Sequence, residues 1–260
     1  MKHTLKITII LAVLFLLSHL VGLFVVNQYT SVELPYGIER PVFDGGSSYA
    51  PLLVSILIAS LLIMMIIRFN AVRVWKVWFI FATIYLLGIA FTSFVTSLVA
   101  LFLAIVLGLL KFYRSSVIIH NFTELFVYSG IAAIFSPVMS VFSASVLLII
   151  ISIYDMIAVW KTKHMVSIAK FQTKAKMFAG LAIPYGKKTA ILGGGDIGFT
   201  LLFSGVVLIK LGVLQALIVS LFTTLALFLL LVYSSKNKFY PAMPYLSAGC
   251  FLGLLISFLV

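Results

Sequence analysis

The strongest constraint on this chain is a series of long apolar stretches separated by short basic segments. Each has about 17–22 residues, the length that an α-helix needs to cross a hydrocarbon core of about 30 Å. A transmembrane β-barrel would show short segments of alternating hydrophobicity instead. The sequence therefore predicts an all-α, polytopic membrane protein forming a single transmembrane domain over residues 1–260. Its nine expected spans lie at residues 6–27, 50–67, 76–93, 95–111, 116–136, 139–160, 191–209, 212–233 and 243–260.

The composition excludes a soluble globular fold. Of the 260 residues, 63% are hydrophobic and 9% are charged, against about 25% charged residues in ordinary soluble domains. The single cysteine cannot form an intrachain disulfide, and the four histidines lack the HExxH spacing of a zinc protease. We therefore expect neither a metal nor another cofactor. The net charge of +12 fits anionic lipid headgroups, so no nucleic-acid partner is expected.

The distribution of basic residues predicts the orientation of the chain. Lys and Arg gather in the segments that nine spans place on the N-terminal side of the membrane, including Lys111 and Arg114 after the fourth span. The opposite segments have only Arg40 and Lys210 as basic residues. Cytoplasmic loops carry the excess of Lys and Arg. We therefore expect a cytoplasmic N-terminus and an outside C-terminus.

The longest predicted cytoplasmic segment is a basic loop at about residues 161–190, between helices 1–6 (about 6–160) and helices 7–9 (about 191–260). Basic and apolar residues alternate irregularly over residues 165–182. This pattern is typical of an interfacial amphipathic helix, but a solvated linker fits it equally well.

Carboxylates are scarce, and two of them lie inside apolar stretches. An ionisable group within a membrane span is costly and marks a candidate functional site. Asp155 is expected about 9 Å inside the cytoplasmic end of its span, and Asp196 at most about 12 Å inside the next. This matching depth predicts a dyad in which one carboxylate activates water while its protonated partner polarises a peptide carbonyl. Each aspartate could instead cap a helix or pair with a lysine, and the assignment of acid and base stays open.

Three short motifs surround these aspartates. They are Tyr-Asp in the sixth span, Gly-x-Gly-Asp at the seventh and Pro-Ala-Met at the last. In this order and on one membrane side they resemble the motifs of the presenilin and signal-peptide-peptidase family of intramembrane aspartyl proteases, whose third motif has Leu where this chain has Met243. The short chain is similar to a compact, archaeal-like microbial presenilin homologue. The resemblance implies catalysis by Asp155 and Asp196, and an active-site and substrate-binding motif formed by Tyr154, Gly193, Gly195, Pro241, Ala242 and Met243.

The resemblance also implies the substrates and surroundings of the enzyme. Its substrates would be proteins with transmembrane helices, cut within or near the membrane, and its other partners would be lipids. Accessory subunits would not be required, and homo-oligomerisation stays open. The protein would be a multi-pass protein of the cell membrane, with lateral substrate access near Pro241 and the Gly193–Gly195 segment.

Two other functions stay open at this point. A prepilin-type peptidase also combines Gly-x-Gly-Asp with a second aspartate, although it accounts less well for the Tyr-Asp and Pro-Ala-Met motifs. A proton or cation transporter, or a leak channel, could use Glu124, Asp155 and Asp196 as its polar path. Glu124 has His120, Asn121 and Thr123 as polar neighbours in the sequence, so an interhelical polar contact is the alternative for this residue.

Overall fold

The structure is a computed structural model that describes residues 4–42, 46–69, 71–114, 116–162, 178–186, 188–235 and 240–260. The described chain is helical apart from one β-hairpin. The long helices are α1 (Leu5–Gln28), α2 (Tyr49–Arg68), α3 (Val72–Phe91), α4 (Ser97–Tyr113), α5 (Val117–Phe135), α6 (Val141–Ile157), α8 (Gly194–Leu211), α9 (Val213–Tyr233) and α10 (Met243–Ser257). The shorter elements are the 3₁₀ turns η1 (Pro35–Gly37) and η2 (Ser136–Val138), the π-helical turn η3 (Ala158–Thr162), and the strands β1 (Gly180–Tyr185) and β2 (Lys188–Gly193).

The predicted all-α, polytopic fold is confirmed. Each of the nine apolar stretches coincides with one long helix of the described chain. Seven of these helices are long and apolar enough to cross a membrane. The other two, α4 with 17 residues and α10 with 15, are shorter apolar helices. The agreement follows from bilayer thickness, which sets the length of an apolar run.

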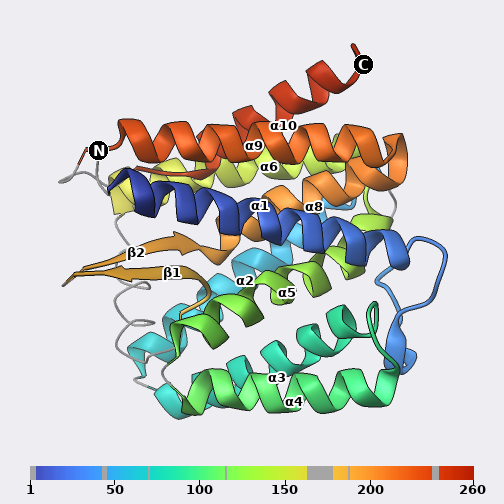
Figure 1. Ribbon diagram of the computed structural model, residues 1–260, viewed down its shortest axis with the longest axis vertical. Helices are drawn as coiled ribbons and strands as arrows, with labels where there is room; N and C mark the ends of the chain where they lie inside the picture. The colour runs from blue at the N-terminus through green and yellow to red at the C-terminus, as the bar shows by residue number, and fades with distance from the viewer. Residues whose placement is uncertain are drawn as a thin grey trace.

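The helices form three layers. Figure 1 shows α3 and α4 along one side of the molecule and α9 and α10 along the other, with α1, α5 and α8 between them. Close packing between α9 and α10 depends on small residues: a side chain at Gly253 would lie 2.7 Å from the Val219 Cα atom, and one at Gly249 would lie 2.9 Å from the Phe222 carbonyl oxygen. Small residues at interfaces between membrane helices permit such approaches.

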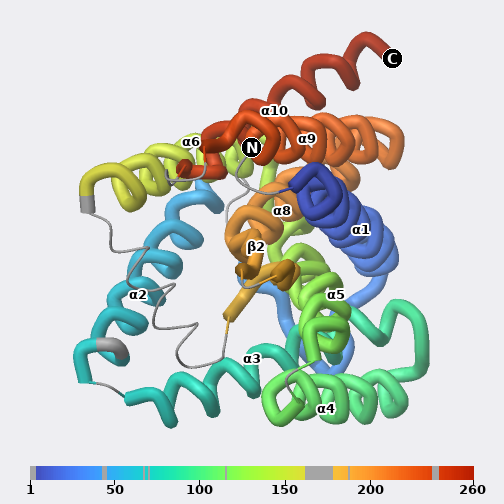
Figure 2. Tube along the Cα trace, turned by 60° about the vertical axis from the view of Figure 1, so that its left-hand side comes forward, coloured from blue at the N-terminus to red at the C-terminus, as the bar shows by residue number. Residues whose placement is uncertain are grey.

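Helix α2 is attached more loosely than the others. It stands between α6 and α3 (Figure 2), and it packs against only these two helices to any extent among the described elements. Only 6% of its apolar window is buried within the protein, against 44% for the window of α5. Most of its surface is therefore available to lipid or to another helix.

The β-hairpin corrects two sequence-based expectations. Residues 180–182 belong to β1 and not to an amphipathic helix or a linker, and residues 191–193 end β2 instead of beginning the seventh span. Of the rest of the predicted amphipathic segment, residues 178–179 are described and have no regular secondary structure, whereas residues 165–177 lie outside the described residues. Strands β1 and β2 pair antiparallel from Gly180↔Gly193 to Tyr185↔Lys188. A short apolar run does not distinguish a strand from the start of a buried helix by periodicity, which is why the span was placed three residues too early.

Candidate active site

Asp155 lies near the end of α6, just before the helix widens into the π-helical turn η3. Its side chain is buried, with 7% exposed. One carboxylate oxygen, Oδ2, accepts a hydrogen bond from the Met243 amide at 3.1 Å, and the Ala242 amide also bonds this carboxylate. The beginning of α10 therefore directs backbone donors at Asp155. Pro241 precedes them and is itself buried.

The Tyr-Asp and Pro-Ala-Met motifs thus meet in space although they are far apart in the sequence. Tyr154 is half-buried beside Asp155 on α6. The polar contact between α6 and α10 continues one turn deeper, where the Ser152 and Ser247 hydroxyls are 2.8 Å apart. A proline-containing start leaves the first amides of α10 without partners in their own helix. These amides are free to hold the Asp155 carboxylate.

Asp196 occupies the third position of α8, where Gly193 is the N-cap. The alternative that Asp196 is itself the N-cap does not hold. Its carboxylate instead turns back and bonds the Gly193 amide, as the third residue of a capping box does. The same carboxylate lies within electrostatic range of Asp155. Because α6 and α8 pack against each other, the end of one helix and the start of the other deliver the two acids to the same region.

The glycine triplet before Asp196 is crowded at its middle position. A methyl group at Gly194 would overlap the Tyr128 hydroxyl and would lie 3.0 Å from the Tyr128 ring carbons. At Gly195 the nearest atom would be 3.7 Å away, an ordinary contact with Phe199, and at Gly193 it would be the Asp196 carboxylate at 3.2 Å. The motif had singled out Gly193 and Gly195. The structure adds Gly194 as the position with the least room.

An apolar cavity of about 770 Å³ lies beside this segment. Its walls come from α2, α3, α5, α6 and α8 and from the residues next to the hairpin. The lining residues include Leu52, Ser55, Ile56, Ala59, Trp78, Tyr128, Ile131, Phe135, Leu147, Phe178, Ala179, Gly193, Gly194, Gly195, Gly198, Phe199 and Leu202. Three consecutive lining residues, Gly193–Gly195, lead directly to Asp196. The size and lining are suited to an apolar polypeptide segment.

A buried polar cluster centred on Glu124 of α5 adjoins this glycine segment through Tyr128, which lies against Gly194. Glu124 accepts hydrogen bonds from Lys111, from Tyr128 and from the Gly180 amide, the last at 2.7 Å. The open question about Glu124 is therefore answered in favour of an interhelical polar contact. Lys111, which the sequence placed in a cytoplasmic loop, is instead a buried residue of α4 that pairs with Glu124. Its charge therefore no longer counts toward the orientation.

The sequence contains a signal for this cluster in the spacing of polar residues on α5. His120, Asn121, Glu124 and Tyr128 are spaced so that all four lie within about 100° of one face of a helix. A polar stripe on an otherwise apolar membrane helix predicts a protein contact on that face. The partner, a β-hairpin, could not be identified from the stripe.

Comparisons with known proteins identify the family and the fold of the chain. The signal-peptide peptidase and presenilin aspartyl protease family matches residues 12–260. Fourteen chains of solved structures match. A presenilin family intramembrane aspartate protease solved in space group C222 has a TM-score of 0.69 and 19% sequence identity, over 97% of this chain and 98% of its own. The same type of protein in space group P2 gives a TM-score of 0.67 and 20% identity, with 96% of each chain covered.

At these identities the solved structures establish the fold, whereas the family match rests on the sequence itself. No curated protein matches the chain. The family match covers nearly the whole length, including all three motifs and both aspartates. The chain therefore belongs to the signal-peptide peptidase and presenilin family of aspartyl proteases, and it is a multi-pass intramembrane aspartyl protease.

Proposed function

We propose that Asp155 and Asp196 form the catalytic dyad with which this enzyme hydrolyses peptide bonds of transmembrane-helix substrates. One observation carries the assignment: two carboxylates from helices that pack together lie within electrostatic range of each other, beside an apolar cavity. Among the described residues, the remaining acid inside a helix, Glu124, is already paired with Lys111. Glu33 and Glu39 lie on the segment between α1 and α2, next to Arg40, which shares a pocket with Ser140 and Lys210 at the ends of α6 and α8 that do not carry the aspartates.

The chemistry follows from sharing one proton between the two acids. Two nearby carboxylates do not both ionise readily, so one serves as a base and the other as an acid. The ionised carboxylate takes a proton from water, whose oxygen adds to the peptide carbonyl carbon while the protonated partner donates to the carbonyl oxygen. The C–N bond of the resulting tetrahedral diol then breaks as its nitrogen takes a proton from one carboxyl group and a diol hydroxyl gives a proton to the other, which restores the shared proton of the dyad. No covalent enzyme intermediate is formed.

Backbone amides hold each carboxylate in place for these steps. The Ala242 and Met243 amides orient Asp155, and the Gly193 amide orients Asp196. This gives the Pro241–Met243 and Gly193–Gly195 motifs a positioning role. Preorganised donors around reacting groups cost no rearrangement at the moment of reaction.

A substrate helix must unwind before its carbonyl can be attacked, because its own hydrogen bonds shield the scissile peptide. We infer that the outer edge of β2 receives the unwound segment. Within the described residues the sheet has two strands, so β2 has one edge without a neighbouring strand, and this edge ends at Gly193, three residues before Asp196. Addition of a strand to an exposed sheet edge is a common way to bind an extended peptide.

Substrate access is proposed to lie beside α2. Leu52, Ser55, Ile56 and Ala59 line the cavity from one face of this helix, while most of the helix surface is not covered by the rest of the protein. A small displacement of α2 would open the cavity laterally to the membrane. This replaces Pro241 as the expected gate, because Pro241 is buried and is not among the cavity-lining residues.

We further propose that the chain works as one transmembrane domain in the cell membrane, without accessory subunits, and with its N-terminus in the cytoplasm. The orientation rests on Lys and Arg, such as Arg73 and Lys161, at the dyad end of the bundle. Single cysteines introduced at Lys161 and at Arg40 in a Cys250→Ser background test it. An impermeant thiol reagent added outside intact cells should label the residue at 40 only, and the reverse pattern would invert the orientation.

The dyad is tested with purified protein and a single-pass helical substrate, with products mapped by mass spectrometry. Cuts inside the apolar segment should disappear in Asp155→Asn and in Asp196→Asn, whereas the matched control Glu33→Gln on the segment after α1 should cut normally. Cleavage persisting in either aspartate variant would remove the proposed mechanism. A cut confined to a basic leader outside the apolar segment would favour prepilin-type processing.

A further inference from the structure

Strand β1 has an outer edge that faces α5. The Gly194 amide donates to the Ala179 carbonyl at 3.0 Å, so residues 179 and 194 form a hydrogen-bonded pair of the antiparallel ladder. Pairs alternate along such a ladder. The backbone groups of Gly180 and Ala182 therefore point away from β2 and need other partners.

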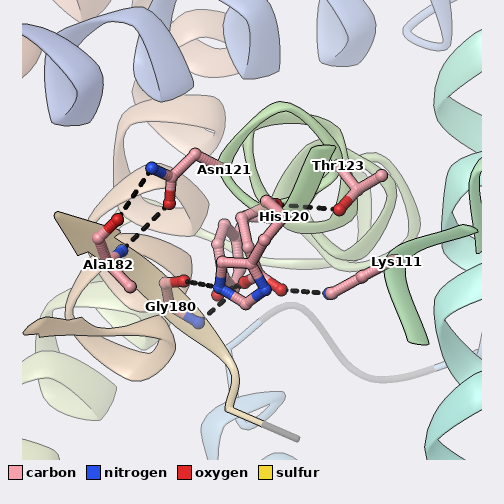
Figure 3. Close-up of polar contacts among 8 residues, drawn as sticks. Lys111, His120, Asn121, Thr123, Gly180 and Ala182 are labelled. Carbon is pink, nitrogen blue, oxygen red and sulfur yellow. Dashed lines mark hydrogen bonds and ion pairs between the residues drawn. The ribbon is translucent and has the colours of Figure 1, made fainter. Parts of the chain in front are cut away.

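Helix α5 supplies all of those partners through side chains. Asn121 both accepts from the Ala182 amide and donates to the Ala182 carbonyl, each at 2.9 Å. The His120 ring donates to the Gly180 carbonyl at 2.8 Å, and Glu124 accepts from the Gly180 amide at 2.7 Å. Figure 3 shows these bonds meeting the strand from one side. Side chains of a helix thus take the place of a third strand.

Glu124 is the centre of this contact. The residue is 1% exposed, and its two carboxylate oxygens receive the Lys111 ammonium, the Tyr128 hydroxyl and the Gly180 amide. Lys111 also lies about 5.5 Å from the Phe79 ring centre. A buried carboxylate needs both a counter-charge and hydrogen-bond donors, and here it has them from α4, α5 and β1.

Two routes connect this cluster to Asp196. Gly180 pairs directly across the sheet with Gly193, whose amide bonds the Asp196 carboxylate. Tyr128, which donates to Glu124, lies against Gly194 so closely that a methyl group there would overlap its hydroxyl. Displacing the hairpin from α5 would therefore shift the residues that begin α8.

We propose that Glu124 is a positioning residue, which docks the β-hairpin onto α5 and thereby holds Asp196 in its place for catalysis. The inference rests on the proposed dyad, and it extends that proposal to a residue that touches neither the substrate nor the reacting atoms. The competing explanation is that Glu124 only neutralises Lys111 and ties α4 to α5. The two explanations differ in the importance of the Gly180 amide.

Two double variants separate these explanations. K111M/E124Q removes both charges but keeps a side-chain oxygen that accepts from the Gly180 amide, whereas K111M/E124L removes both charges and the acceptor. We expect K111M/E124L to lower kcat by about 100-fold, the effect of misplacing a reacting group by about 1 Å. K111M/E124Q should recover most of that loss. Hydrogen exchange of peptides covering residues 178–193 should be faster in K111M/E124L and close to wild type in K111M/E124Q.

Equal kcat values for the two double variants, or unchanged exchange in K111M/E124L, would overturn the inference. Should K111M/E124L fail to fold, Asn121→Ala gives an independent test, because it removes both bonds to Ala182 and leaves the ion pair intact. It should accelerate exchange of the hairpin and lower kcat, and wild-type values for both would again contradict the inference. Cleavage by Asp155→Asn or by Asp196→Asn would refute the dyad itself. If both aspartate variants are inactive and K111M/E124L is fully active, only the role of Glu124 is refuted.

Discussion

Helices α2 and α5 form opposite kinds of wall around the same apolar cavity. Helix α5 is bonded to the β-hairpin through His120, Asn121 and Glu124. Helix α2 has little protein around it, with 6% of its apolar window buried. We infer that the two helices have different roles. Helix α5, the fixed wall of the cavity, holds Asp196 in place, and α2, the loosely attached or mobile wall, admits the substrate.

Helix α5 also packs closely against α3. A methyl group at Gly130 would lie 2.5 Å from the Leu86 carbonyl oxygen on α3, so α5 and α3 touch backbone to backbone. On α2, by contrast, the hydrogen bond that Ser55 makes within the described chain goes to its own helix, at the Pro51 carbonyl. Regions with few buried contacts open at lower free-energy cost than well-packed ones. Mobility is therefore expected on the α2 side of the cavity.

The largest effect is expected from a substitution at Gly194, where Tyr128 of the fixed wall α5 leaves the least room for a side chain. Gly194→Ala should force Tyr128 and the start of α8 apart, lowering the cleavage rate by about 100-fold and the free energy of unfolding by about 1–3 kcal/mol. Gly195→Ala is the matched control for stability, since its added methyl group would make only ordinary contacts. Thermal unfolding and cleavage assays measure both effects. Equal stability of the two variants would contradict the packing described at Gly194.

A smaller effect is expected from a large side chain on α2, the mobile wall, that fills part of the cavity. Ala59→Trp would occupy space that the substrate needs and should weaken cleavage by roughly tenfold, or about 1.4 kcal/mol of substrate binding. Leu61→Trp is the control, because Leu61 is 57% exposed and is absent from the cavity lining. Michaelis–Menten analysis with a helical substrate should show a raised KM for Ala59→Trp only. Similar KM values for the two variants would place substrate access elsewhere.

The smallest expected effect is the loss of one hydroxyl group from the fixed wall. Tyr128→Phe removes a hydrogen bond to Glu124 but keeps the ring against Gly194 and Gly198. The expected cost in the free energy of unfolding is about 1 kcal/mol, and chemical denaturation in mixed micelles measures it. A loss as large as that of Gly194→Ala would show that the hydroxyl, and not the packing of the ring, holds the wall together.

Most of the fold could be predicted from the sequence because a bilayer imposes one length on every apolar span. The two aspartates could be selected as candidate site residues for a related reason, since a charge such as that of Asp155 is costly inside a span, and the structure places both acids in the same region. The partners of these aspartates depend on the tertiary fold. Nothing in Pro241–Met243 alone indicates that its amides reach Asp155, and nothing around Glu124 indicates a strand at Gly180.

The hairpin was missed for a different physical reason. Its strands are six residues each, too short for their period to stand out, and β2 runs into α8 without a polar break. A sheet at membrane depth is tolerated only where protein or water satisfies its edges. The backbone groups on the outer edge of β1 form hydrogen bonds with side chains of α5. These bonds depend on the assembled fold and cannot be read from the hairpin sequence.

The central claim is that α5 is a fixed wall of the cavity and α2 a mobile one. Hydrogen exchange with mass spectrometry tests it most directly, on inactive Asp196→Asn with and without a helical substrate. Without substrate, amides of α2 (residues 49–68) should exchange faster than those of α5 (residues 117–135) and of the hairpin (residues 178–193). Adding substrate should slow exchange in α2 and β2 and leave α5 unchanged. Equal protection of α2 and α5 without substrate, or substrate protection confined to α5, would contradict the account.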